Sequence, residues 1–513
     1  MYRLVNIDAR YAAAIQDCSG SPRLGKIEPA EHAGCLATCG ANSRLANPAL
    51  KTRQADLESI AGTIVLMATW YRRVFLLAIP LILSNLTQPL LSTVDTILSG
   101  HLPGPAALGG VAVGGIFFNS VFWTFGFLRM STTGLVAQSY GARDHEELRL
   151  HFARALLCAL AIGAVVLAVR GPLILLAITM LGAGPDVAQN AEIYCDIRIW
   201  SAPAALANYV ILGSLLGRQR ARTALVVQAA INVVNVAVAL WLVMRLHWGV
   251  AGIATATLTA DWAGLLLGLA IVWQSRMISG TLDAGCIRWK SLAHGPSLLH
   301  LFALNRDLLL RTLSLVAAYA WFTRVGARAG DVTLAANAVL LNLHGIASYA
   351  LDGFANATEA LVGEAVGARR VADYRAVLRA STVAAGVVAA LISLAYLALG
   401  GELIRILTNQ EAVRTLAARY LPWAAVMPVI AVWGYQLDGI FIGATRAREL
   451  RDSMLISFLG YIVLAVVLNW WIGNHGLWCA FCCFMVLRGA TLRLRLPRIE
   501  KSFAEATPAP AAA

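Results

Sequence analysis

Long apolar stretches separated by short polar connections dominate the chain. Five stretches contain no Asp, Glu, Lys or Arg: 96–128, 223–244, 246–260, 380–401 and 453–487. About 20 apolar residues are enough for a helix to cross a bilayer. Because backbone polar groups in lipid must be satisfied within their own segment, we expect helices rather than open strands. The pattern predicts twelve spans, at 74–99, 106–130, 154–179, 194–216, 224–244, 249–273, 296–323, 332–357, 376–400, 415–442, 453–472 and 475–492.

The connections between these spans fall into two alternating sets that differ in positive charge. By the positive-inside rule, the richer set faces the cytoplasm, and an even number of spans then places both termini there. The richer set holds Arg143, Arg149, Arg154, Arg218, Arg220, Arg222, Arg276, Arg288, Lys290, Arg369, Arg370, Arg375, Arg379, Arg446, Arg448 and Arg451. The poorer set holds only Arg245, Arg324, Arg328, Arg405 and Arg414.

Composition supports a membrane protein. Of 513 residues, 59% are hydrophobic and 13% are charged, whereas soluble domains have about 25% charged residues. The mean hydropathy of +0.68 argues against soluble enzymes, nucleic-acid-binding proteins and secreted disulfide-rich proteins. The net charge of +13 is explained by the connections. The nine cysteines show no zinc or redox spacing, since Cys35 and Cys39 lack a second ligand pair, and we expect no bound metal or cofactor.

The two ends of the chain differ from the rest. Residues 1–66 mix Gly, Pro, Ser and charge without a span-length apolar run, and they lack the apolar core of a signal peptide. We expect 1–66 and 496–513 to be disordered. A further hypothesis is that translation begins at Met67, which an intact-mass measurement of the native protein tests.

An internal repeat with an offset of 226 residues organises the rest. GLVAQSYGAR (134–143) aligns with ALVGEAVGAR (360–369), and LGSLLGRQRAR (212–222) aligns with DGIFIGATRAR (438–448). Gly100 and Gly104 likewise align with Gly326 and Gly330. Six helices per half give the halves parallel topology, as in transporters that handle substrate between two lobes. The sequence predicts an all-α membrane protein of two six-helix lobes, at 67–290 and 291–495.

The first span carries a polar stripe. Asn85, Gln88, Ser92 and Asp95 follow one another at steps of three, four and three, so they share one helix face. A carboxylate inside a span is costly and usually faces a cavity or a partner. The stripe therefore predicts the lining of a wet cavity, where Asp95 can exchange a proton or help to hold a sodium ion.

Two further spans of the first half have polar faces. Gln228, Asn232 and Asn235 share a face of the fifth span, and Thr257 and Asp261 lie one turn apart in the sixth. We expect Asn235, Thr257 and Asp261 to converge with the acid of the first span. For Asn235 and Thr257, hydrogen bonding between helices is an equally good interpretation.

The second half has its own polar set. Asn305, Arg306, Asp307 and Arg311 begin the seventh span, where the opposite charges can neutralise one another structurally. Candidates for contact with a cationic substrate are Asn232 in the first half and Asp352, Asn356, Glu359, Tyr435 and Asp438 in the second.

Several separate motifs resemble the multidrug and toxic compound extrusion (MATE) transporters, in the branch of the DNA-damage-inducible protein F (DinF). The resemblance covers about 70–495. It is carried by VDTILSGHL (94–102), FWTFGFLRMSTTGLVAQSYGA (122–142), FALNRD (302–307), YALDGFANATEA (349–360), LDGIFIGATRARELRDSM (437–454), GNHGLWCA (473–480) and LRG (487–489).

The resemblance implies an exporter of amphipathic or cationic compounds, driven by inward protons or sodium ions. It also implies that Asp95 is the coupling carboxylate, with Gln88, Asn235 and Thr257 beside it. One departure matters: the run NVVNVAVAL places Ala239 where members of the branch often carry an Asp. Losing one of two carboxylates weakens a sodium site, so we favour protons and expect Asp261 to supply the missing charge.

The leading interpretation is therefore a secondary antiporter, working by alternating access in the bacterial inner membrane, without nucleic-acid partners and as a monomer. A flippase for lipid-linked precursors shares the architecture but favours a cavity lined by several Arg residues. A membrane-embedded lipid-modifying enzyme needs a metal cluster or a nucleophile with its base, and neither pattern is evident in the sequence.

Overall fold

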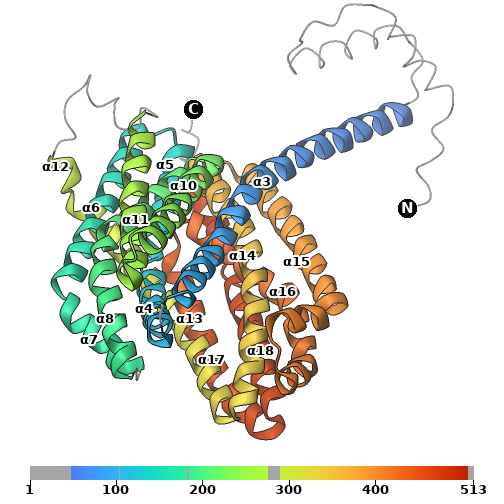
Figure 1. The fold of residues 1–513 in the computed structure, drawn as a ribbon. Coiled ribbons are helices and arrows are strands. Elements are labelled where there is room, and N and C mark those ends of the chain that lie inside the picture. Colours follow the sequence, from blue (N-terminus) through green and yellow to red (C-terminus); the bar gives the residue numbers. More distant parts are fainter. Residues whose placement is uncertain (1–47, 103, 182–183, 275–288, 506–513) are drawn as a thin grey trace, which may run out of the picture. The chain divides into compact units, whose positions relative to one another are not determined.

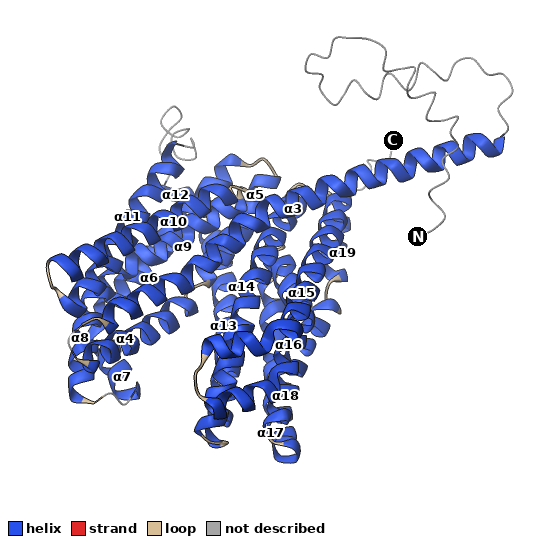
Figure 2. Ribbon diagram, turned by 45° about the vertical axis from the view of Figure 1, so that its right-hand side comes forward, coloured by secondary structure: helices blue, strands red, loops and turns tan. Residues whose placement is uncertain are grey.

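The computed structural model describes residues 48–102, 104–181, 184–274 and 289–505, and the regular structure in these ranges is helical (Figures 1 and 2). Twelve segments of this part of the chain are long and apolar enough to cross a membrane. Each overlaps one predicted span, so the predicted number of spans is confirmed. The chain divides into two compact units, Met1–Leu66 and Met67–Ala513, and the candidate site lies in the second.

Short helices break up several spans of the first half. Its elements are α3 Pro48–Gly100, α4 Pro105–Thr124, α5 Phe127–Gly141, α6 His145–Ala168, α7 Arg170–Leu181, α8 Pro185–Arg198, η2 Ile199–Ser201, α9 Ala202–Gly217, α10 Ala221–Leu240, η3 Trp241–Arg245 and α11 Gly249–Gln274.

The second half has longer uninterrupted helices. Its elements are α12 Trp289–Leu292, α13 Gly295–Arg328, α14 Asp331–Gly367, α15 Val371–Leu407, α16 Glu411–Gly443, α17 Ala447–Ile472, α18 Asn474–Arg493 and α19 Pro497–Glu505.

Prolines explain two of the breaks, which the apolar pattern did not predict. A proline ring clashes with the carbonyl four residues earlier and lacks an N–H. Pro172 follows the end of α6 at Ala168 by four residues, and α7 starts again at Arg170. Pro203 stands four residues after Ile199, where the 3-10 turn η2 separates α8 from α9. The predicted span 154–179 is therefore two helices.

The ends of the chain differ from expectation where the structure describes them. Helix α3 already begins at Pro48, within the predicted disordered extension, while residues 1–47 lie outside the described ranges. Helix α19 lies in the predicted disordered tail. Its Ile499 and Phe503 are one turn apart and both buried, and the Phe503 ring contacts Tyr374 with 5.3 Å between centroids. This apolar pair was too short for the sequence pattern to register as an element.

The internal repeat is visible in the packing of equivalent glycines. A Cβ atom added to Gly213 would lie 2.6 Å from the carbonyl oxygen of Arg129, and one added to Gly439 would lie 2.3 Å from that of Ala355. Both the glycines and their partners are 226 residues apart. Backbone of equivalent helices therefore approaches equally closely in the two halves, and only glycine permits the approach.

The two halves meet where α5 crosses α14. A Cβ atom on Gly141 would lie 2.1 Å from the carbonyl oxygen of Glu364, and one on Gly367 would lie 1.9 Å from that of Gln138. Gly141 and Gly367 are equivalent in the repeat, as are Gln138 and Glu364. The crossing therefore has each half contacting the other through the same pair of positions.

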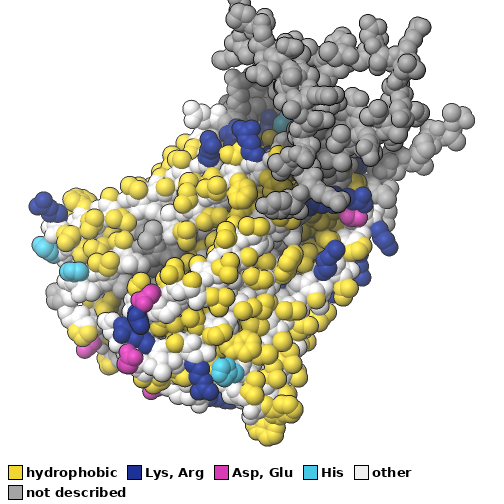
Figure 3. All heavy atoms as spheres, turned by 90° about the vertical axis from the view of Figure 1, so that its right-hand side faces the viewer, with side chains coloured by type: hydrophobic (Ala, Val, Ile, Leu, Met, Phe, Trp, Pro, Cys, Tyr) yellow, Lys and Arg dark blue, Asp and Glu magenta, His cyan; other side chains and the backbone are white. Residues whose placement is uncertain are grey.

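Apolar side chains cover the outside of the helices. On the face in Figure 3, hydrophobic atoms dominate between zones that contain Lys and Arg. Large apolar side chains that are 65% to 82% exposed include Leu175, Val233, Leu266, Ile406 and Trp470. Such a surface is stable only against lipid.

Candidate functional site

A cavity of about 690 Å³ lies among the helices of the first half. Its walls come from α3, α4, α8, α9, α10 and α11, and Tyr349 of α14 adds one contact from the second half. Of the four groups predicted to converge, Asp95, Thr257 and Asp261 line this cavity, and Asn235 does not. Gln228 and Asn232 line it as well.

Two polar groups of helix α3 have different surroundings. The Asn85 side-chain amide donates to the carbonyl of Tyr349 at 3.2 Å, which ties α3 to the second half. Farther along α3, Asp95 lines the cavity. The Asp95 carboxylate atom Oδ1 is buried and has no hydrogen-bond partner in the protein. The side chain of Gln88, predicted to lie beside it, is outside the described part of the structure.

A buried arginine shares this cavity with the two carboxylates. Arg198, the last residue of α8, lines the same wall as Asp95 and Asp261. Its guanidinium donates to the Tyr194 hydroxyl one turn earlier. It also lies over the Phe118 ring, 4.8 Å from the centroid. The aromatic contacts hold the cation in place.

The amide side chains bridge neighbouring helices. Asn235 donates to the Thr257 hydroxyl at 2.9 Å, and Gln228 donates to Asn232 at 3.3 Å. Asn208 of α9 donates to the backbone carbonyl of Asp261 at 2.9 Å. The predicted interhelical role of Asn235 and Thr257 is thus seen directly, and Asn235 is fully buried behind the cavity wall.

Several polar atoms around the cavity have no partner within the protein. They are Asp95 Oδ1, Arg198 Nε, Asn208 Oδ1, Asn232 Nδ2 and Asn235 Oδ1. Buried polar atoms are almost always hydrogen-bonded. Their concentration at one site is typical of a place that binds ions, protons or polar ligands.

The second-half candidates form a separate group that does not line this cavity. Asp438 of α16 accepts from two buried guanidinium groups, those of Arg311 and Arg488. The Arg488 guanidinium also lies over the Tyr435 ring at 5.2 Å, and the Tyr435 and Ser348 hydroxyls are 2.8 Å apart. Asp438 and Tyr435 are therefore engaged within the protein.

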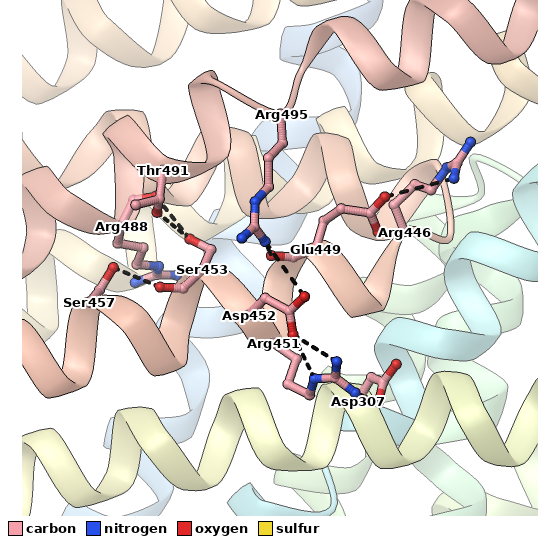
Figure 4. A network of polar contacts seen from close by, with 10 residues as sticks. All are labelled: Asp307, Arg446, Glu449, Arg451, Asp452, Ser453, Ser457, Arg488, Thr491 and Arg495. Carbon is pink, nitrogen blue, oxygen red and sulfur yellow. Dashed lines mark hydrogen bonds and ion pairs between the residues drawn. The ribbon is translucent and has the colours of Figure 1, made fainter.

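Opposite charges neutralise one another nearby, as expected for the start of the seventh span. Asp307 pairs with Arg451 at 2.8 Å, and Arg451 pairs with Asp452 at 2.7 Å (Figure 4). The Arg495 guanidinium reaches the backbone carbonyl of Glu449 at 2.8 Å (Figure 4). The network fastens α13, α17 and the end of α18 together.

The remaining second-half candidates lie along α14. Asp352 is half-buried, whereas Asn356 and Glu359 are buried. The Arg129 guanidinium of α5 donates to Asn356 at 3.1 Å and so crosses between the halves. Glu359 Oε1 has no partner. These groups lie near the junction of the halves rather than in the first-half cavity.

A set of polar contacts joins the two halves. Glu364 of α14 accepts from Arg73 of α3 at 2.7 Å and from Gln219 at 2.6 Å. In the equivalent place of the repeat, Gln138 of α5 donates to the Thr445 hydroxyl at 3.1 Å. We call these five residues the inter-half lock.

Sequence reasoning missed both the lock and Arg198. Arg198 lies near the start of a predicted span and follows Asp196, so it resembled a polar entrance to the membrane. Its spacing of one turn from Tyr194, before a long uncharged run, was the available signal. For the lock, the signal was that Gln138 and Glu364 are aligned in the repeat.

Three comparisons with known proteins agree with this architecture. The family model MatE matches residues 80–241 and 308–471, which together exceed half of the chain. The chain is 45% identical over 419 residues to the DNA damage-inducible protein F of Escherichia coli K12, covering 81% of this chain and 90% of that protein. It is 26% identical over 418 residues to the multidrug and toxin extrusion protein 2 of Mus musculus, covering 78% and 70%.

A solved structure has the same fold. An outward-facing multidrug resistance MATE family transporter of the MOP superfamily aligns with a TM-score of 0.75 at 19% identity, covering 84% of this chain and 97% of that one. Two matches of one family model, as found here, are what a duplicated six-helix unit produces. The chain therefore belongs to the MATE family, in the branch of the E. coli DNA damage-inducible protein F, and is a multi-pass bacterial membrane transporter rather than an enzyme.

Proposed function

We propose that this protein exports amphipathic or cationic small compounds in exchange for protons, by alternating access, from the bacterial inner membrane. The observation that carries the proposal is the first-half cavity, where Asp95 and Asp261 share one polar chamber. Two carboxylates carried by apolar helices bind cations or protons because an uncompensated charge there is costly. Asp261 then supplies the carboxylate that is missing at position 239, where this chain has an alanine.

Charge balance gives a reason for exchange rather than co-transport. Of the lining residues, Asp95, Asp261 and Arg198 are the acids and bases. With both acids ionised, their sum is one negative charge, which either a proton or a monovalent cationic compound neutralises. Once either the proton or the cationic compound has bound, no net negative charge is left to attract the other, so the two compete for the cavity. A ligand that binds one conformation better than the other shifts the equilibrium between them.

The position of the inter-half lock supports an orientation for the cycle. The inter-half lock joins segments beside the Arg-rich connections, since Gln219 lies between Arg218 and Arg220, and Thr445 precedes Arg446. Positive charge marks the cytoplasmic side. We therefore propose that both termini are cytoplasmic and that this state is closed toward the cytoplasm.

Efflux of a fluorescent cation such as ethidium from proteoliposomes, under an imposed proton or sodium gradient, tests the proposal. Asp95→Asn and Asp261→Asn should each reduce proton-driven efflux by about tenfold or more, the scale expected for removing an essential buried charge. Asp196→Asn is the matched control, because Asp196 is an exposed acid of α8 outside the cavity, and it should leave efflux unchanged. Equal efflux with sodium and with protons, or wild-type efflux by Asp95→Asn, would contradict proton coupling through this site.

A further inference from the structure

Arg198 is a fixed cation on the wall of the cavity that also holds the two acids. It lines the chamber together with Asp95 and Asp261. In the part of the chain that the structure describes, Arg198 forms no ion pair, so its charge is not committed to one of the two acids. An arginine keeps its charge at every physiological pH, which makes this cation permanent.

The surroundings of Arg198 hold it at this position. Its guanidinium lies 4.8 Å from the Phe118 centroid and 5.4 Å from that of Tyr194. The Tyr194 hydroxyl accepts one of its hydrogen bonds. Its Nε, which is buried, has no partner. Aromatic packing on α4 and α8 thus restrains the side chain, and its Nε donor is not used within the protein.

The ionisable neighbours on every wall are known. Asp95 comes from α3, Tyr194 from α8, Tyr209 from α9, Asp261 from α11 and Tyr349 from α14. Of the described lining residues, those of α4 and α10 are neutral. The tyrosine hydroxyls do not ionise at physiological pH unless strongly perturbed. The exchangeable charge of the chamber is therefore set by two acids and one arginine.

We propose that Arg198 is the resident cation of this cavity and makes its ion site selective for protons over sodium. The inference deepens the proposed function and rests on it. A sodium ion needs several oxygen ligands and a surplus of negative charge. The guanidinium neutralises one of the two acids, so a sodium ion meets a single net negative charge with no surplus to replace its water shell. A bulky organic cation carries the same charge but also gains contacts with aromatic walls such as Phe122 and Trp123. A proton remains acceptable because it binds covalently to one carboxylate and needs no coordination shell.

Sodium binding to the purified protein, measured with radioactive sodium at alkaline pH, tests this directly. Wild-type protein should show no saturable binding. Arg198→Gln removes the cation and leaves two acids, so it should show saturable sodium binding, half-maximal at least about tenfold below the highest sodium concentration at which the wild type shows none, the size expected for loss of a nearby like charge. Adding Asp261→Asn to Arg198→Gln should abolish that binding.

Two control variants separate charge from packing. Arg198→Lys keeps a cation and should remain without saturable sodium binding. Arg170 also lies over an aromatic ring, that of Trp200 at 5.0 Å, but does not line the cavity, so Arg170→Gln should behave as wild type. In proteoliposomes, the pH of half-maximal efflux by Arg198→Gln should lie about one pH unit above that of the wild type, because a positive charge near the cavity acids has been removed.

The outcomes distinguish this inference from the proposed function. Saturable sodium binding by wild-type protein, or by Arg198→Lys to the same extent as Arg198→Gln, would overturn the role of Arg198. Folded Arg198→Gln that binds no sodium would also overturn it. Failure of proton-driven efflux by wild-type protein would instead contradict the proposed function, and it is measured independently of sodium binding.

Discussion

Single side chains in this protein divide into those held by partners and those left with binding capacity. Asp438 belongs to the first kind, since Arg311 and Arg488 both donate to it in a buried setting. Asp95 belongs to the second, with a buried oxygen that has no partner. Sequence position alone does not separate the two, because both are acids within apolar helices.

Replacing Asp438 should therefore destabilise the fold. Asp438→Asn leaves two buried guanidinium groups without their shared countercharge, and breaking a buried pair costs about 3–5 kcal/mol. Thermal unfolding of the purified protein in detergent should show a clearly lower midpoint. Arg306→Gln is the control, because Arg306 is 63% exposed in its pair with Asp307 and such pairs contribute about 0–1 kcal/mol. An unchanged midpoint for Asp438→Asn would show that the triad does not stabilise the fold.

The candidate site was predictable residue by residue only where a charge interrupted an apolar helix. Asp95 and Asp261 stood out for that reason. The spacing of polar residues in the fifth span placed Gln228 and Asn232 on one face of that helix. Arg198 did not stand out, because a basic residue near a span end is ordinary. Its inward orientation follows from packing on Phe118, a contact between residues that are 80 positions apart.

At the scale of helices, the crossing of α5 and α14 sets how closely the two halves approach one another. Gly367→Ala would place a methyl group 1.9 Å from the Gln138 carbonyl oxygen, so the helices must separate to accommodate it. Because this crossing lies beside the inter-half lock, the closed state should become less populated. We expect efflux to fall several-fold, and spin labels on the two Arg-rich connections should report a longer distance between halves.

A second glycine of the same helix is the matched control for that prediction. A Cβ atom on Gly345 of α14 would meet nothing within 4 Å, so Gly345→Ala should leave both efflux and label distances unchanged. Equal effects of the two substitutions would mean that helix flexibility, rather than close approach, is responsible.

The twelve spans and the register of the repeat were readable from the sequence because both are periodic signals that extend over many residues. The breaks at Pro172 and Pro203 were local, and an apolar count over a whole span averages them away. Helix α19 was missed for the opposite reason, since two buried apolar residues are too few to form a pattern. Tertiary packing determines these elements more than their own composition does.

For the whole molecule, charge balance predicts an electroneutral exchange. The cavity carries one net negative charge when Asp95 and Asp261 are ionised beside Arg198, so one proton or one monovalent cation neutralises it. The cavity is then neutral both with a bound proton and with a bound monovalent cation, so the complete exchange moves no net charge across the membrane. A potential of 100 mV is worth about 2.3 kcal/mol for each charge moved, but it has no effect where the net charge moved is zero.

Ethidium efflux from proteoliposomes should therefore respond to an imposed pH difference and be insensitive to a membrane potential set by potassium and valinomycin. Acceleration by the potential alone would mean that more than one proton is exchanged for each ethidium. Arg198→Gln provides an internal comparison, because its cavity carries two negative charges when both acids are ionised. That variant can take up a second proton per cation, and its efflux should become sensitive to the potential where the wild-type efflux is not.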